Sequence, residues 1–192
     1  MKDRRQVWFL TSNEGKFREA AAVAAASRIP LRMLATKKIE IQSDRLQEIA
    51  SYAAQEASNR LGVSVVAEDA GLFIDSLHGF PGPYSSYVFS RLGTRGILTL
   101  MENISRRDAK FRSVAAFCAP RHKLRCFAGT VVGTIGQRPR GVGGFGFDTI
   151  FIPTRGDGRT FAQMTIEEKN RISHRAASFR KLSRWLSTLR TV

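Results

Sequence analysis

Cysteine is scarce in this chain: the 192 residues include Cys118 and Cys126 and no others. A small disulfide scaffold carries many more, so that class is excluded. A chain of this length buries roughly 70% of its unfolded surface, so it needs neither disulfides nor a structural metal to hold a core. We expect two buried, reduced thiols. A cross-strand disulfide is the alternative, because the two cysteines flank a predicted turn at residues 120–123.

Long hydrophobic runs are also missing. The apolar stretch nearest the N-terminus, Val7–Leu10, has four residues, which is too short for a signal peptide. No other run approaches the roughly 20 apolar residues of a membrane span. With 43% hydrophobic and 24% charged residues, the composition is typical of a soluble globular protein. We therefore expect a cytoplasmic protein without a membrane partner.

Acidic residues are few. The chain has 16 Asp and Glu against 31 Lys and Arg, a formal net charge of +15. Such an excess favours a polyanionic partner and says nothing about the fold. Nucleic acid is one candidate and the triphosphate of a nucleotide is another, and the charge alone does not distinguish them.

The first third of the chain alternates between strand and helix patterns. Three short strands are predicted, at Gln6–Thr11, Leu31–Ala35 and Val63–Ala67. The third is a continuous β-branched run, which favours a strand buried on both faces. A helix follows the first strand, with Ser12 or Asn13 as its N-cap. A second helix is predicted over Leu46–Leu61, closed by Gly62.

The remainder predicts a hairpin and a final helix. Phe111–Ala119 and Leu124–Ile135 indicate two long antiparallel strands, after a turn-rich segment and a helix through Ile97–Met101. A strand is expected at Thr149–Ile152. The last helix is amphipathic, with apolar residues spaced by three and four at Phe179, Leu182, Leu186 and Leu189. No internal repeat or linker is evident, so we predict a single domain over residues 1–192 with a mixed α/β fold.

The turn between the first strand and the first helix is the first candidate for chemistry. Its residues are Thr11, Ser12, Asn13, Glu14, Gly15 and Lys16. A helix N-terminus after a strand offers free N–H groups to phosphate, and the lysine adds a positive charge. The stretch is not a Walker A loop, because neither the upstream glycine nor a following Ser or Thr is present. A simple N-cap beside a solvated lysine is the alternative.

An acidic pair is the second candidate. Glu68 and Asp69 come directly after the predicted strand Val63–Ala67, where open α/β sheets place their ligands. Hard carboxylate oxygens suit Mg²⁺, which takes one or two carboxylates and leaves its other positions to water and phosphate. Glu40, beyond the second strand, could add a further carboxylate. Solvated acids at a strand end are the alternative.

Two further stretches have residues suited to a ligand. Gly141–Gly146 matches G-x-G-x-x-G, but a strand rather than a helix follows it, so a dinucleotide loop is excluded. Its neighbouring aromatics, Phe145 and Phe147, either stack on a base or anchor the core. Three residues near the last helix are hydrogen-bond donors: Lys169, His174 and Arg175. They either contact the polar edges of a ligand or are simply surface charges.

Taken together, these motifs resemble the inosine/xanthosine triphosphate pyrophosphatases, a family that removes noncanonical purine nucleotides, and its archaeal members look most similar. Five stretches carry the resemblance: TSNEGK at 11–16, IEIQ at 39–42, EDAGLFIDSLHGFPGPYSS at 68–86, GGFGFDTIFIP at 143–153 and FAQMTIEEKNRISHRA at 161–176. The resemblance implies an elongated central mixed sheet with two lobes around a nucleotide cleft. It also implies a homodimer.

The resemblance assigns roles to positions of this chain. Residues 11–16 would hold the triphosphate. Glu40 and Asp69 would bind Mg²⁺, with Glu68 close to the same site and Asp69 also the proton acceptor. The base and the rest of the nucleotide would be contacted by Phe145, Gly146, Phe147, Asp148, Lys169, His174 and Arg175.

Four positions depart from the commoner family pattern. Ala70 stands where Ser is usual, so only its backbone can contact phosphate. Phe147 replaces Tyr or Trp, and Thr149 replaces Pro. Ala53 occupies a place where many bacterial members carry lysine. These changes bear on rate and phosphate affinity rather than on the type of reaction.

The implied reaction is hydrolysis of ITP, dITP or XTP to the monophosphate and pyrophosphate. A 6-oxo group on the base can accept a hydrogen bond from Lys169, His174 or Arg175. Adenine presents a 6-amino donor there, which leaves buried donors unpaired at a cost of roughly 1–3 kcal/mol per group.

Two other functions compete with this one. A nonenzymatic nucleic-acid-binding protein would use a basic face of the last helix, formed by Arg171, Arg175, Arg180, Lys181, Arg184 and Arg190. It leaves Glu40, Glu68 and Asp69 without a purpose, and we expect that nucleic acid is not required. A Maf-like pyrophosphatase acting on modified pyrimidines is disfavoured by the intact Ser-His-Arg sequence at 173–175.

Overall fold

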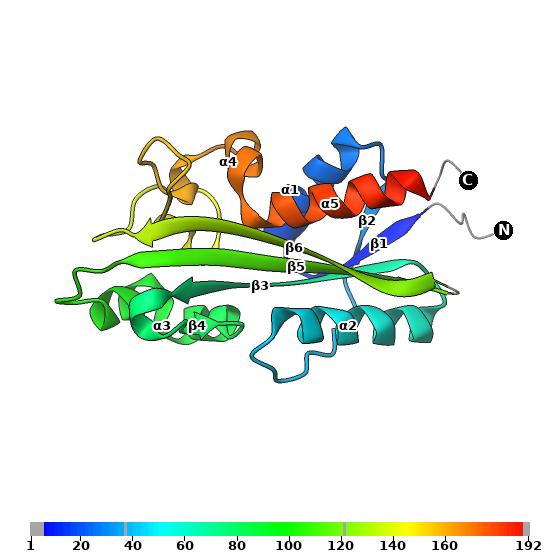
Figure 1. The fold of residues 1–192 in the computed structure, drawn as a ribbon, viewed down its shortest axis with the longest axis horizontal. Helices are drawn as coiled ribbons and strands as arrows, with labels where there is room; N and C mark the ends of the chain where they lie inside the picture. Colours follow the sequence, from blue (N-terminus) through cyan, green and yellow to red (C-terminus); the bar gives the residue numbers. More distant parts are fainter. Residues whose placement is uncertain (1–5, 37, 121, 190–192) are drawn as a thin grey trace. The chain divides into compact units, whose positions relative to one another are not determined.

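The computed structural model describes residues 6–36, 38–120 and 122–189. These residues form a mixed α/β fold, as predicted, with one seven-stranded sheet (Figure 1). The strands are β1 Val7–Leu10, β2 Leu31–Leu34, β3 Val65–Ile74, β4 Pro81–Gly82, β5 Asp108–Ala119, β6 His122–Ile135 and β7 Phe151–Pro153. The helices are α1 Glu14–Ala26, α2 Leu46–Leu61, α3 Ser85–Leu100, α4 Ile166–Ile172 and α5 His174–Thr188. Neighbouring strands follow the order β2-β1-β3-β5-β6-β7, and β4 pairs with β3.

The chain divides into two compact units, each assembled from separated segments. Unit 1 comprises residues 1–69, 113–129 and 175–192, and unit 2 comprises residues 70–112 and 130–174. Strands β3, β5 and β6 contribute residues to both units. That residues 1–192 act as a single domain stays a prediction.

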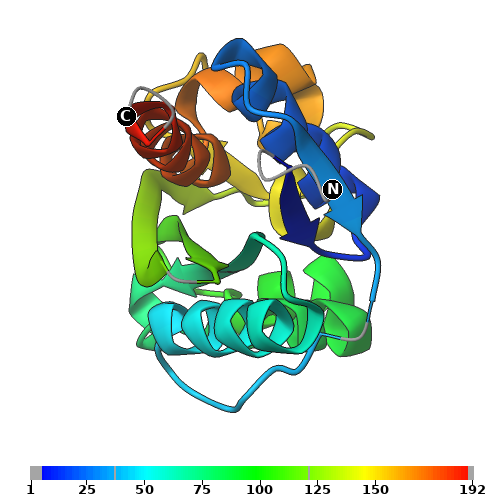
Figure 2. The ribbon, with the colours of Figure 1, turned by 90° about the vertical axis from the view of Figure 1, so that its right-hand side faces the viewer.

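Unit 1 contains the parallel part of the sheet. Strand β1 pairs in parallel with β2 and with β3. Helix α2 covers one face of this part, and α1 and α5 cover the other (Figure 2). Phe9 of β1 meets Phe179 of α5 in that core, with ring centroids 5.1 Å apart. Helix α2 has the predicted bounds, and Gly62 ends it in the left-handed conformation at φ +66°.

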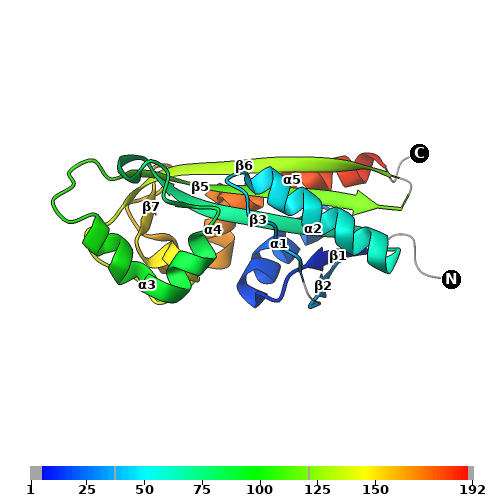
Figure 3. The same ribbon diagram turned by 90° about the horizontal axis from the view of Figure 1, so that it is seen from below.

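Unit 2 is built on antiparallel pairs. Strand β7 pairs with the end of β6, and β4 pairs with the end of β3. Its apolar core includes the rings of Phe111, Phe151 and Phe161, of which Phe111 meets Phe151 edge-on and stacks on Phe161. Helix α3, labelled in Figure 3, packs against the 3-10 turn at Gly146–Thr149 in this unit. The rings of its Phe89 and of Phe147 meet edge-on, with centroids 5.2 Å apart.

Strand β3 corrects the sequence prediction most. It runs from Val65 to Ile74 rather than ending at Ala67, so Glu68 and Asp69 lie inside a strand and not beyond its end. The strand continues because β4 pairs with its distal half. The buried carboxylate of Glu68 is tolerated there because cations lie beside it.

Smaller differences concern the last elements. Residues Gly146–Thr149 form a 3-10 turn, so β7 begins at Phe151 rather than at Thr149. Leu189 lies beyond the end of α5 and is 41% exposed, so it does not extend the predicted apolar stripe. Helix α4 was not predicted. It is capped by Thr165 and Glu168, whose side chains each accept the other's backbone N–H, as in a capping box.

The structure tests the expectation for the two cysteines. Cys118 and Cys126 are free thiols, so the disulfide alternative is wrong, but only Cys118 is buried and Cys126 is partly exposed. The sulfur of Cys126 lies 3.2 Å from the hydroxyl oxygen of Ser51. Within the described ranges, every helix is too short or too polar to cross a membrane.

Candidate active site

The turn at residues 11–16 is held by its own side chains. Asn13 N donates to the hydroxyl oxygen of Thr11 at 3.1 Å, and Lys16 N donates to Asn13 Oδ1 at 2.9 Å. Asn13, rather than Ser12, is therefore the N-cap of α1. This capped N-terminus presents the positive end of a 13-residue helix, which favours an anion beside it.

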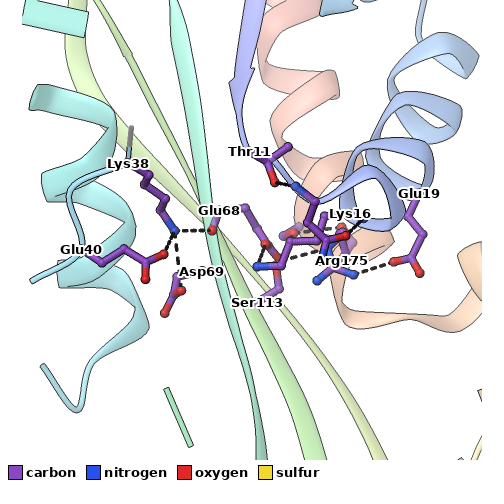
Figure 4. Close-up of polar contacts among 11 residues, drawn as sticks. Thr11, Lys16, Glu19, Lys38, Glu40, Glu68, Asp69, Ser113 and Arg175 are labelled. Carbon is purple, nitrogen blue, oxygen red and sulfur yellow. Dashed lines mark hydrogen bonds and ion pairs between the residues drawn. The ribbon is translucent and has the colours of Figure 1, made fainter. Parts of the chain in front are cut away.

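Glu68 is the centre of a buried network in unit 1 (Figure 4). Only 2% of the residue is exposed. Its Oε1 accepts from the Ser113 hydroxyl at 2.9 Å and from Arg175 Nε at 3.1 Å. Its Oε2 lies 3.0 Å from Lys16 Nζ. Arg175 also donates to Glu19 Oε2 at 2.6 Å, so the network joins β3 to α1, β5 and α5.

This network changes the expectation for Arg175. The residue is 2% exposed, and its guanidinium lies between the carboxylates of Glu19 and Glu68. Sequence reasoning missed Glu19 and Ser113. A signal was present for Glu19, since it stands on the apolar stripe of α1, three residues after Lys16, where an unpaired carboxylate would be costly.

Lys38 organises a second group of charges in unit 1. Its Nζ lies 2.6 Å from Glu40 Oε1 and 3.9 Å from Asp69 Oδ1, and it donates to the backbone oxygen of Glu68 at 3.3 Å. Figure 4 shows Asp69 and Glu68 on opposite sides of β3, as neighbours on a strand must be. The sequence had not singled out Lys38.

Burial governs the ionisation of these acids. It raises the pKa of Asp69 to about 6, against the opposing effect of the nearby ammonium groups of Lys38 and Lys16. Burial also acts to raise the pKa of Glu40, but the charge and hydrogen bond of Lys38 outweigh it and hold that pKa below its usual value. Of these two carboxyls, Asp69 takes up a proton more readily near neutral pH.

The same group of acids fits a divalent cation. Asp69 Oδ2 is buried, and no described residue donates a hydrogen bond to it. Such an oxygen suits a hard cation, and Mg²⁺ needs only one or two protein carboxylates. Among the described residues there is no cluster of three or more His, Cys, Asp or Glu that would cage a metal. Glu40 and Asp69 are therefore the fitting pair, whereas both oxygens of Glu68 are engaged with Lys16, Ser113 and Arg175.

A different cluster lies in unit 2. Lys169, a buried residue of α4, donates to Asp148 Oδ2 at 2.5 Å. Its Nζ is 5.0 Å from the ring centroid of Phe145 and 5.2 Å from that of Phe161, within cation–π range. Asp148 also accepts from the backbone N of Phe145 at 2.9 Å. The structure thus brings three predicted residues together: Phe145, Asp148 and Lys169.

The other predicted residues of unit 2 lie around this cluster or in the core. The His174 ring stacks on the Phe111 ring, with the centroids 4.8 Å apart and the planes at 9°. Phe147 is buried in the apolar core, which matches the core-anchoring alternative. Gly146 has φ +61°, a conformation that favours glycine. Ala70 is half-buried in β3. The boundary between the two units falls at Asp69–Ala70, Arg112–Ser113, Gly129–Thr130 and His174–Arg175.

The fold and these two clusters define a class of mixed α/β protein. One cluster has carboxylates on β3 beside charged residues of α1, and the other has a lysine of α4 next to aromatic rings. The profile of the Ham1 family matches residues 7–185. The chain therefore belongs to the Ham1 family, and the resemblance drawn from its motifs is confirmed.

Individual relatives agree with this assignment. The dITP/XTP pyrophosphatase of Methanopyrus kandleri is 44% identical over 180 residues, covering 94% of this chain and 95% of the relative. That of Hyperthermus butylicus is 46% identical over 182 residues, covering 95% of both. Among solved structures, the Ham1 protein of Staphylococcus aureus has a TM-score of 0.81 at 26% identity, covering 95% of this chain and 98% of the other. A HAM1 protein from Coxiella burnetii has a TM-score of 0.83 at 27% identity, with the same coverage.

Proposed function

We propose that this protein hydrolyses noncanonical purine nucleoside triphosphates, dITP, ITP and XTP, to the monophosphate and pyrophosphate. One observation carries the proposal: a capped helix N-terminus and Asp69, a buried carboxylate with a raised pKa, occur in one unit. The chain is also 44% identical to a dITP/XTP pyrophosphatase over 94% of its length.

The phosphates belong with the 11–16 turn in this proposal. The first N–H groups of α1 provide donors, and the helix end provides a positive potential. Lys16 adds an ammonium that Glu68 holds in place at 3.0 Å. Because Glu68 is itself fixed by Ser113 and Arg175, Lys16 is positioned before any phosphate arrives, which lowers the cost of binding.

Asp69 is assigned the proton transfer. In the metal-free protein its pKa of about 6 leaves it mostly ionised at neutral pH, and an ionised carboxylate can accept a proton from the attacking water. Bound Mg²⁺, held by Glu40 and Asp69, would neutralise the charge that develops on the phosphates.

The base belongs with the cluster of unit 2. Lys169 is a cationic donor suited to the 6-oxo group of hypoxanthine or xanthine. The Phe145 ring, which already borders the lysine, offers a face on which a base can stack. Adenine would place its amino group against the buried ammonium, and the unpaired donors would cost roughly 1–3 kcal/mol each.

The nucleic-acid-binding alternative is less well supported. Its basic face required Arg175, which is 2% exposed and paired with two carboxylates. Arg190 of the same face lies outside the described residues. The buried acids on β3 also have no part in that function.

The site of action and the assembly are further parts of the proposal. We place the protein in the cytoplasm, where the nucleotide pool lies, and expect a homodimer. Exposed apolar side chains in and beside α3, Tyr84, Tyr87 and Leu92 among them, support a contact between copies. Light scattering after size exclusion should give twice the chain mass of 21.4 kDa; the mass of one chain would contradict the dimer.

Product analysis tests the proposed reaction. With dITP, ITP or XTP and Mg²⁺, ³¹P NMR should show the monophosphate and pyrophosphate, with ATP turned over at least about tenfold more slowly. Orthophosphate and a diphosphate as products would show cleavage at another bond and would exclude the proposed reaction.

A further inference from the structure

The ammonium of Lys38 stands between the two carboxylates that fit a metal. It lies 2.6 Å from Glu40 Oε1 and 3.9 Å from Asp69 Oδ1 (Figure 4). The backbone oxygen of Glu68 accepts a further hydrogen bond from it at 3.3 Å. The lysine side chain is only 16% exposed, whereas that of Glu40 is 59% exposed. The ammonium is therefore held at a largely buried position by three oxygen atoms, unlike a typical surface ion pair.

We propose that Lys38 is an internal counterion, which competes with the divalent cation for Glu40 and Asp69 and so sets the metal affinity of the nucleotide-free protein. The inference rests on the proposed function, because the competing ligands are the two carboxylates assigned there to Mg²⁺. It adds a residue that neither the motifs nor the family match had assigned.

Electrostatics explains the competition. An ammonium and a divalent cation repel each other strongly at the few ångströms that separate ligands of one site. Binding of the metal therefore requires Lys38 Nζ to leave Glu40, and the energy of that ion pair opposes metal binding. The four-carbon stem of lysine allows such a move without a change in the backbone.

The displaced ammonium needs a new acceptor, and phosphate oxygens are suited to it. Metal and triphosphate should therefore bind better together than separately, since the triphosphate takes the lysine that the metal displaces. Ala53 of α2, where many bacterial members of the family carry lysine, is uncharged and fully buried. We therefore assign to Lys38 the role of the cation that moves from the carboxylates to the phosphates.

Metal binding without nucleotide tests the proposal directly. Mn²⁺, which suits the same oxygen ligands, is titrated into the metal-free protein by calorimetry. Lys38→Met keeps the stem and removes the charge, and it should bind Mn²⁺ about tenfold more tightly than wild type. Lys38→Arg keeps the charge and should stay within about threefold of wild type.

The matched control is Lys110→Met. This lysine pairs with Asp75 at 3.1 Å in unit 2, so the variant loses the same charge and also breaks an ion pair. Its Mn²⁺ affinity should equal that of wild type. If Lys38→Met binds Mn²⁺ no more tightly than wild type and Lys110→Met, the counterion role is wrong.

A second measurement uses the wild-type protein and does not depend on how the variants fold. Acylation of Lys38 Nζ, followed by mass spectrometry, should become several-fold faster when saturating Mg²⁺ displaces the amine from Glu40. Equal rates with and without Mg²⁺ would overturn the proposal. A protein that fails to release pyrophosphate from dITP but shows both Lys38 effects would instead lose the proposed reaction and keep the counterion.

Discussion

Two neighbouring carboxylates, Glu68 and Asp69, lie on opposite faces of β3 and have different surroundings. On the side of α1 and α5, Glu68 Oε1 accepts hydrogen bonds from Ser113 and Arg175, and Oε2 forms an ion pair with Lys16 at 3.0 Å but, like Asp69 Oδ2, accepts no hydrogen bond among the described residues. On the other side, Asp69 meets Lys38 at 3.9 Å, and its Oδ2 accepts no hydrogen bond from a described residue. Burial raises the pKa of Asp69, whose nearest cation, Lys38, is 3.9 Å away, whereas Glu68 has two cations within 3.1 Å. We infer that Glu68 holds the site together and that Asp69 performs its chemistry.

The largest expected effect is on turnover by Asp69→Asn. The amide cannot accept the proton of the attacking water and is a poor ligand for Mg²⁺. We expect kcat for dITP to fall about 10³-fold, within the range of lost general-base catalysis. Steady-state release of pyrophosphate measures it. A loss of less than about fivefold would remove Asp69 from the chemistry.

Glu68→Gln should have the largest effect on stability. It leaves the buried Arg175 and the half-buried Lys16 with one carboxylate fewer, and loss of one partner of a buried pair typically costs about 3 kcal/mol or more. Urea unfolding gives this change in the free energy of unfolding. The control is Glu56→Gln, which breaks the exposed pair with Arg60 and should leave the urea midpoint unchanged. Equal midpoints for the two variants would contradict the structural role of Glu68.

Asp69→Asn should stabilise the metal-free protein, and only above a certain pH. The folded pKa of Asp69 is raised from 3.8 to about 6, so the folded state binds this proton more tightly than the unfolded state. Wild type therefore loses stability as the pH rises from about 4 to about 6, and the neutral amide does not. The gain should reach at most about 3 kcal/mol above pH 6 and vanish below pH 4. A constant difference between the two proteins from pH 4 to 8 would refute the raised pKa.

The smallest effect is expected in unit 2, where Phe145→Leu removes an aromatic face but keeps apolar volume. We expect KM for dITP to rise about tenfold, since stacking of a base contributes roughly 1–3 kcal/mol, with little change in kcat. Phe73→Leu is a control, because this ring contacts Arg112 outside the cluster. An unchanged KM in Phe145→Leu would remove the ring from base binding.

Local signals accounted for the parts of the fold that the sequence predicted well. Helix α2 was bounded correctly because its apolar periodicity and Gly62 lie within the segment itself. The extent of β3 was missed because its continuation depends on pairing with β4, which follows a turn. Helix α4 has 7 residues, too few to show an apolar periodicity, although the spacing of Thr165 and Glu168 is that of a capping box and could have indicated its start.

Sequence reasoning named several residues of the candidate site but not the contacts among them. Residues such as Lys16, Asp69 and Lys169 could be named from motifs and residue type. Their partners could not, because Glu19, Lys38 and Ser113 come from distant segments and have no distinctive spacing. The alternation of side chains along a strand would have placed Glu68 and Asp69 on opposite faces, had the strand been extended through them.

The most direct test of the division between Glu68 and Asp69 is kcat for dITP in Glu68→Gln, measured at a temperature where the variant is folded. The account predicts a kcat within about tenfold of wild type, in contrast to the roughly 10³-fold loss in Asp69→Asn. A loss in folded Glu68→Gln as large as that in Asp69→Asn would show that both carboxylates take part in the chemistry and would contradict the account.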